Sequence, residues 1–233
     1  MLGPSDYAFW ILGFLLDAFV VVSAICRRDF FRYLPINLLM FLAATATCGQ
    51  YLCIHRFGFT SIQYVYFYYY TDILLSILMY FVIIQFYQQV FVDMNVSRYI
   101  RGAAVMLLGA TALFSYAVVH QNGDHLTTRF VVELEQNLNF VGVVLVYLLW
   151  GAVVKLRETR TRLIQLVLAL GVYFSASAGS YALRNLFPGL EMYVLRWLPP
   201  LMGVWLPLAW AYTFTMVSEE ARLATARLAV GDR

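Results

Sequence analysis

Three polar side chains follow one another at helical spacing in and just after the stretch YVYFYYYTD (64–72). Tyr68, Asp72 and Ser76 stand at i, i+4 and i+8, so an α-helix presents them on one face. A carboxylate within an apolar helix is costly to expose to lipid and is expected to face other helices or water. The stripe therefore predicts a polar interior face whose groups hydrogen-bond or form ion pairs.

The first seven residues of this stretch, 64–70, include six aromatic ones. Tyr is enriched at membrane interfaces because its ring prefers the headgroup region while its hydroxyl stays hydrated. Six aromatics surround the whole helix circumference, so some of them must face other helices. We expect Tyr68 and Tyr69 to line the interior with Asp72. The interfacial belt is expected to comprise Tyr64, Tyr66 and Phe67.

Further polar residues gather near the same ends of the other apolar segments, whereas the opposite halves are largely apolar apart from Gln85, Gln88 and Gln89. This asymmetry predicts a ligand cavity that is open to the outside and closed below. Alternatively, Asp72 or Glu133 pairs with an arginine and only locks helices together. The predicted ligand-binding residues are Gln50, Tyr68, Tyr69, Asp72, Glu133, Asn137, Tyr181, Arg184 and Arg196.

Asp17 stands apart from this group, near the centre of the first apolar segment. We expect it to form a hydrogen bond to a neighbouring helix, through Asn37 or a hydroxyl group. The alternative is a carboxylate that couples the protein to proton movement, since ionisable residues in spanning segments often mark functional sites.

No cofactor is predicted. Histidine suits zinc or copper, but the three candidates lie in different segments with loose spacing, so a metal site is the weaker interpretation for His55, His120 and His125. Retinal would need a lysine in the last spanning helix for its Schiff base. The chain's one lysine, Lys155, falls in a loop, which excludes that chemistry.

The whole composition is that of a membrane protein. The 233 residues are 62% hydrophobic and 12% charged, the mean hydropathy is +0.73, and a soluble domain carries about 25% charged residues. Apolar runs of about 20 residues can cross the hydrocarbon core of a bilayer. The sequence predicts an all-α bundle with seven transmembrane helices, at about 7–26, 33–54, 63–91, 103–120, 131–154, 163–184 and 194–217.

Orientation follows from the basic residues. Twelve of the 16 Lys and Arg residues fall in loops 27–32, 92–102 and 155–162 or in the tail 218–233, all on one side of the predicted bundle. The positive-inside rule then places the N-terminus outside and the C-terminus in the cytoplasm. We expect one domain, 1–217, in the cytoplasmic (inner) membrane, followed by a short cytoplasmic tail.

Two patterns concern the packing of the later helices. Gly171, Ser175 and Gly179 recur every four residues, which predicts a face that allows close contact between helix backbones. Three prolines in the last helix remove backbone donors and are expected to bend or loosen it; they are Pro199, Pro200 and Pro207.

The third predicted helix, YYYTDILLSILMYFVIIQFYQQVF (68–91), begins with aromatic and acidic residues and ends with several glutamines. Loops with basic residues follow it. In this respect the chain resembles uncharacterised bacterial seven-helix integral membrane proteins. The resemblance implies a bacterial membrane protein of the same topology and carries no activity, cofactor or catalytic residue.

The sequence favours a receptor-like or sensor-like membrane protein that binds a small ligand in its outer half and acts through a separate membrane-protein partner or as a homo-oligomer. One alternative is a structural or assembly subunit of a larger membrane complex, and another is a small-molecule transporter. We expect no enzymatic activity, because no nucleophile–base or metal constellation is visible. The net charge of +3 is a topology signal, and no nucleic-acid partner is expected.

Overall fold

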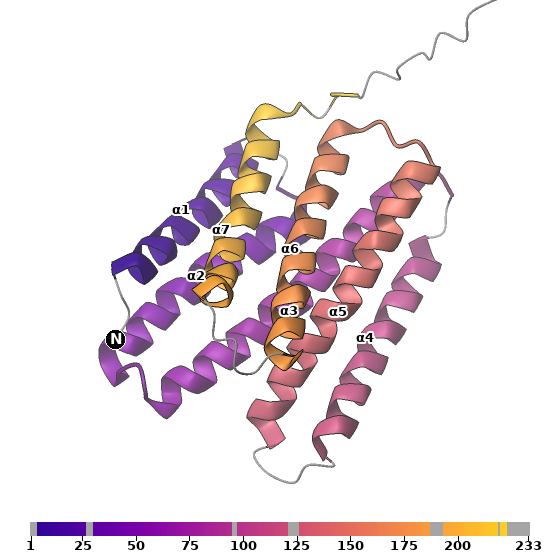
Figure 1. Ribbon diagram of the computed structural model, residues 1–233. Helices are drawn as coiled ribbons and strands as arrows, with labels where there is room; N and C mark the ends of the chain where they lie inside the picture. The colour runs from indigo at the N-terminus through magenta and orange to yellow at the C-terminus, as the bar shows by residue number, and fades with distance from the viewer. Residues whose placement is uncertain are drawn as a thin grey trace, which may run out of the picture.

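The computed structural model describes residues 4–26, 30–94, 97–120, 126–186, 193–218 and 220–222. Within these ranges the chain forms seven α-helices (Figure 1): α1 (Pro4–Cys26), α2 (Leu34–Phe57), α3 (Ile62–Val90), α4 (Ser97–His120), α5 (Leu126–Lys155), α6 (Thr161–Leu186) and α7 (Tyr193–Met216). A 3₁₀ turn, η1 (Val92–Met94), follows α3. Each predicted span corresponds to one helix. The largest difference is at α4, which begins at Ser97 rather than 103 because the helix continues beyond its apolar run.

Six of the described helices, α1 to α6, are long and apolar enough to cross a membrane, which indicates a multi-pass membrane protein. The described part of α7 is not among them, because its prolines and tryptophans lower its mean hydropathy. The turn between α2 and α3 is defined by two local signals. Gly58 ends α2 with φ of 85°, a conformation that favours glycine, and Ser61 caps α3 by accepting a hydrogen bond from the Tyr64 N–H at 3.2 Å.

Six helices form a closed ring in the order α1, α2, α3, α5, α6, α7 and back to α1. Helix α4 lies outside this ring, against α5 and α3, at the edge of the bundle in Figure 1. A small cluster holds it there, with Tyr80, Ala104, Leu134 and Leu138 buried together. The Tyr80 hydroxyl donates to the Ala104 carbonyl at 3.0 Å. The ring therefore has an interior to which α4 does not contribute.

The two ends of the ring differ. We call the end at which α1, α3, α5 and α7 finish the basic end, and the opposite end, at which α3 begins with its tyrosines, the aromatic end. The main core occupies the basic half, where the largest fully buried side chains include Phe86, Leu149, Leu166, Trp210 and Phe214. This half of the ring is therefore filled with side chains.

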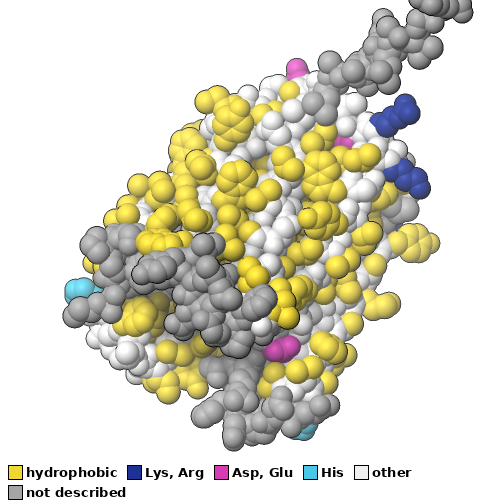
Figure 2. Space-filling model, viewed as in Figure 1, with side chains coloured by type: hydrophobic (Ala, Val, Ile, Leu, Met, Phe, Trp, Pro, Cys, Tyr) yellow, Lys and Arg dark blue, Asp and Glu magenta, His cyan; other side chains and the backbone are white. Residues whose placement is uncertain are grey.

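Figure 2 shows a surface dominated by hydrophobic side chains, with the visible Lys and Arg side chains toward the end from which the C-terminal trace leaves. Large apolar residues are exposed on every ring helix, for example Ile11 at 60% and Tyr147 at 62%. In water such a surface would drive aggregation. In a bilayer it is the surface that contacts lipid.

Helices α5 and α6 approach closely through small residues. At Gly171 an added Cβ would come within 3.3 Å of Val146 on α5, and the Ser175 hydroxyl lies 3.3 Å from that of Tyr147. The predicted small-residue face is confirmed at these two positions. It does not extend to Gly179, where a Cβ would meet no atom within 4 Å.

The tightest contact between these helices has the glycine on α5 instead. There the buried Phe174 ring of α6 lies directly on Gly142 of α5. A Cβ at Gly142 would overlap the ring, so Gly142→Ala should destabilise the bundle by about 1–3 kcal/mol through overpacking. The measurement is the apparent melting temperature in detergent. Gly151→Ala, on the same helix but with open space at its Cβ, is the control. Equal melting temperatures for the two variants would contradict this packing.

Candidate functional site

A cavity of about 170 Å³ lies inside the ring at mid-height. Three carboxyl groups line it, Asp17 from α1, Asp72 from α3 and Glu135 from α5, beside apolar residues of α2, α6 and α7. Further polar lining comes from Ser76, Tyr80, Asn139 and Tyr173. We call this space the acidic cavity. Lys, Arg and His do not occur among its described lining residues, so the carboxyl groups give it negative potential.

Two of the three carboxyl groups form a pair. Asp72 and Glu135 lie in hydrogen-bond contact, and the Tyr181 hydroxyl of α6 donates to Glu135 Oε1 at 2.6 Å. Two ionised carboxylates can only accept hydrogen bonds, so the pair must hold a proton.

The third carboxyl group stands alone. Asp17 is only 7% exposed, and it forms no hydrogen bond to any residue that the structure describes. The predicted link to Asn37 is wrong, because the Asn37 amide donates instead to the Phe30 carbonyl at 2.9 Å. A buried carboxyl group without a partner is costly, and Asp17 has the cavity in front of it.

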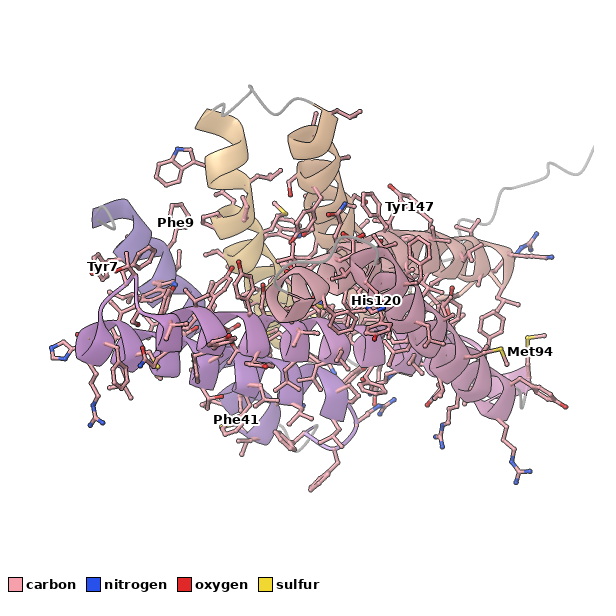
Figure 3. The ribbon with its side chains drawn as sticks, turned by 90° about the horizontal axis from the view of Figure 1, so that it is seen from below. Tyr7, Phe9, Phe41, Met94, His120 and Tyr147 are labelled. Atoms are coloured by element: carbon pink, nitrogen blue, oxygen red, sulfur yellow. The ribbon has the colours of Figure 1, made fainter. Side chains whose placement is uncertain are left out.

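A larger cavity of about 660 Å³ adjoins the acidic cavity toward the aromatic end. The two share four lining residues, Asp17, Ala43, Leu75 and Gly203. We call the larger cavity the outer cavity. Six aromatic residues line the rest of it, Phe9, Trp10, Phe14, Phe59, Tyr64 and Tyr68. Figure 3 shows Phe9 projecting from α1 toward α7, where its ring centroid lies 5.7 Å from that of Trp197.

Helix α7 forms one wall of both cavities through its proline-containing segment. Pro199 and Pro200 line the outer cavity and Pro207 lines the acidic cavity. Proline at 207 has no N–H to donate to the carbonyl four residues earlier, which belongs to Gly203. Gly203 has only backbone atoms with which to line the two cavities, and open space lies in front of it. At Gly203 the predicted proline-rich helix thus presents backbone to the interior, between lining side chains such as Met202 and Leu206.

The structure brings together some of the residues predicted to bind a ligand. Gln50 and Tyr68 line the outer cavity, and Asp72 lines the acidic cavity. Tyr181 does not line the acidic cavity but donates a hydrogen bond to Glu135, which does. Tyr69 lines neither cavity but packs edge-on against Tyr68, with ring centroids 5.7 Å apart. The inward stripe predicted from Tyr68, Asp72 and Ser76 is confirmed.

Two of the predicted residues face away from the ring. The Asn137 amide donates to Ser115 of α4 at 2.9 Å and to Glu133 at 3.4 Å, so Glu133 and Asn137 belong to the contact between α5 and α4. The side chains of Arg184 and Arg196 lie outside the described residues. The predicted pairing of Asp72 or Glu133 with either arginine therefore stays a prediction.

The predicted aromatic belt is only partly correct. Tyr66 is 42% exposed and stacks on Tyr70, as expected for an interfacial residue. Phe67 instead packs on Gly49 of α2, and a Cβ at Gly49 would overlap its ring. Tyr64 lines the outer cavity. The belt prediction was wrong for Phe67 and Tyr64, because α2 covers that side of α3.

The predicted ligand-binding residues omitted Glu135 and Tyr173, and the sequence did not connect Asp17 with Asp72. A signal existed for Glu135, since it lies two residues from Glu133 and hence about 200° around the helix axis. One of the two must therefore face the ring if the other faces α4. Among the described residues, no group of three His, Cys, Asp or Glu side chains is arranged to hold a metal ion. His55 and His120 each lie beside a tyrosine, and His125 is outside the described part of the chain.

The basic end carries a separate polar pocket of about 340 Å³, lined by Arg32, Gln85, Gln88, Gln89, Arg160 and Arg162 among others. Arg160 binds Glu158 with its Nε 2.9 Å from Oε1, and it also donates to the Gln89 carbonyl at 2.7 Å. The Thr161 N–H donates to the Ala221 carbonyl at 3.1 Å. These contacts tie the α5–α6 loop to the end of α3 and to the segment after α7, so they close this end of the bundle.

The fold and the cavities define a polytopic helical membrane protein with an acidic interior that adjoins an aromatic outer cavity. Comparison of the chain with protein-family models, with curated proteins and with solved structures finds no match.

The ion pair at the basic end has a pH dependence that can be measured. The hydrogen bond from Arg160 lowers the pKa of Glu158 below its ordinary value of 4.5. The pair therefore contributes stability above about pH 4.5 and loses it as the pH falls through the lowered pKa. Glu158→Gln should lower the apparent melting temperature by about 1–3 °C at pH 7, since partly exposed pairs contribute about 0.2–1 kcal/mol.

The difference between Glu158→Gln and the wild type should shrink when the same melting experiment is run below pH 4. Glu220→Gln, which removes an exposed carboxyl group after α7, is the matched control and should change nothing. A deficit of Glu158→Gln that is the same at pH 7 and at low pH would show that the charge of Glu158 is not what stabilises this loop.

Proposed function

We propose that the chain is a receptor-like or sensor-like integral membrane protein that binds a small ligand in the outer and acidic cavities. One observation carries the proposal: the cavities adjoin at the aromatic end while the basic half of the ring is packed. A volume of about 660 Å³ lies within the range of small-molecule sites. An unpartnered, buried Asp17 gives such a ligand a polar anchor.

The proposal includes seven spanning helices, with the N-terminus outside and the C-terminus in the cytoplasm. The basic residues support this orientation, since 12 of the 16 belong to the basic end or the tail and the positive-inside rule assigns that side to the cytoplasm. The aromatic end then faces outward. A ligand arriving from outside meets the aromatic wall first and the carboxyl groups second.

Signalling requires a partner, which we assign to the basic end. There the α5–α6 loop, the end of α3 and the segment after α7 are joined by Arg160 and Thr161. A ligand that moves α7 against α1 or α6 would also move the segments at this junction, because α7 lines both cavities and continues to Met216. The structural-subunit alternative gives no role to the adjoining cavities or to an unpartnered carboxyl group.

Transport is the second candidate, and the proline-containing segment of α7 is the observation that favours it. Pro199, Pro200 and Pro207 all line the cavities, and helices bend most readily at proline. Transport also requires that the packed half opens to the basic end. A receptor does not need that opening, so the two candidates differ in which face of the membrane reaches the acidic cavity.

Cysteine accessibility separates these candidates. In a variant without the three native cysteines, Ala43→Cys introduces a thiol at the junction of the two cavities. A membrane-impermeant cationic thiosulfonate should modify it from the outer face of sealed vesicles and not from the inner face. Leu166→Cys, fully buried in the basic half, is the negative control. Modification from both faces would favour transport, and modification from the inner face alone would reverse the proposed orientation.

The receptor proposal itself is tested by purification in native lipid, with mass spectrometry of every protein and small molecule that co-purifies. We expect a small molecule that is lost in Gly203→Leu, whose side chain would enter the open space in front of Gly203, together with a separate protein partner. A fixed set of protein partners, with no small molecule in either sample, would instead support the structural-subunit alternative.

A further inference from the structure

The lining of the acidic cavity defines the charge of what it can hold. Three carboxyl groups converge on one space from α1, α3 and α5. Among the described residues, neither this cavity nor the outer cavity has a Lys, Arg or His in its lining. Charges interact strongly in an interior of low dielectric constant. An anion is therefore disfavoured, whereas a cation offsets the negative potential.

Asp17 gives this potential a specific anchor. It is more than nine-tenths buried, it lines both cavities, and no described residue hydrogen-bonds to it. The neighbouring helix α7 supplies an acceptor of another kind, because Pro207 leaves the Gly203 carbonyl without its helical N–H and the Gly203 backbone lines the same two cavities. A carboxylate and a free carbonyl are both acceptors, so they call for a ligand with several donors.

The arrangement of the carboxyl groups selects among cations. A metal ion needs its oxygen ligands within about 2.0–2.6 Å, and the described His, Cys, Asp and Glu residues form no group of three that could hold one. A polyatomic cation can span groups that are further apart. An ammonium group on a carbon chain carries up to three N–H donors and meets this requirement.

The outer cavity supplies the rest of the recognition. Its aromatic side chains include Phe9, Trp10, Tyr64 and Tyr68, which can bury an apolar body and attract a cation to their ring faces. We propose that the ligand is an organic amine, with its ammonium group between Asp17 and the Gly203 backbone and its apolar body in the outer cavity. This inference rests on the proposed function and deepens it by naming the ligand class.

The test uses the full chain without its three native cysteines, in lipid nanodiscs, with Ala43→Cys as the reporter and N-ethylmaleimide, an uncharged reagent, as the probe of access. Three ligands of matched shape are compared at pH 7: phenethylamine as the cation, 2-phenylethanol as the neutral analogue and 3-phenylpropionate as the anion. The quantity measured is the concentration of each ligand that halves the rate of thiol modification.

We expect phenethylamine to protect at a concentration at least tenfold lower than 2-phenylethanol, with no protection by 3-phenylpropionate. In Asp17→Asn, which is isosteric, the advantage of the amine over the alcohol should disappear. Glu135→Gln should reduce it and Glu133→Gln should not, since Glu133 faces α4 outside the cavity. This pair of variants on one helix separates the cavity from a general loss of negative charge.

Equal protection by the amine and the alcohol, unchanged in Asp17→Asn, would overturn the amine inference and leave the ligand cavity standing. Rapid modification that none of the three ligands slows would also overturn the amine inference. The carboxyl groups would then bind protons rather than an amine. Protection by the amine only after Arg184→Gln or Arg196→Gln would mean that an arginine of the chain itself occupies the site. A reporter thiol that never reacts would contradict the proposed function, because the cavity would then be closed to small molecules.

Discussion

The fold depends on one constraint, which is that a carboxyl group cannot be left facing hydrocarbon. Asp17, Asp72 and Glu135 come from three helices whose surfaces are otherwise largely apolar and exposed. Lipid is compatible with almost any rotation of such helices, so the apolar residues alone do not fix their orientation. The carboxyl groups do, because each helix must turn them toward the ring. The acidic cavity is the shared consequence of these three rotations.

The ring divides packing and binding between its halves. In the basic half, large side chains such as Trp210 and Phe214 fill the interior, and the Arg160–Glu158 pair joins the connecting segments. In the other half, small residues and backbone leave room, notably at Ala43 and Gly203, and the two cavities adjoin there. A packed half beside a half with cavities suits a protein that binds a ligand without opening a path across the membrane.

The aromatic start of α3 serves several environments at once. Within residues 64–68, Tyr66 is exposed, Phe67 packs on Gly49, and Tyr64 and Tyr68 line the outer cavity. Tyrosine suits all of these positions, since it combines a large apolar ring with a polar hydroxyl group. The density of aromatics in this stretch therefore reflects three neighbours, namely lipid, α2 and the cavity.

The sequence by itself determined the helices, most of their ends and the inward stripe of Tyr68, Asp72 and Ser76, because hydropathy and helical spacing are properties of each segment alone. Only the tertiary structure decided that Glu135 faces the ring while Glu133 faces α4. Helix α5 has polar residues on both faces, so its hydrophobicity cannot choose between them. Contacts such as Phe174 on Gly142 set its rotation. That Asp17 and Asp72 line one cavity likewise follows from ring closure, which no single segment encodes.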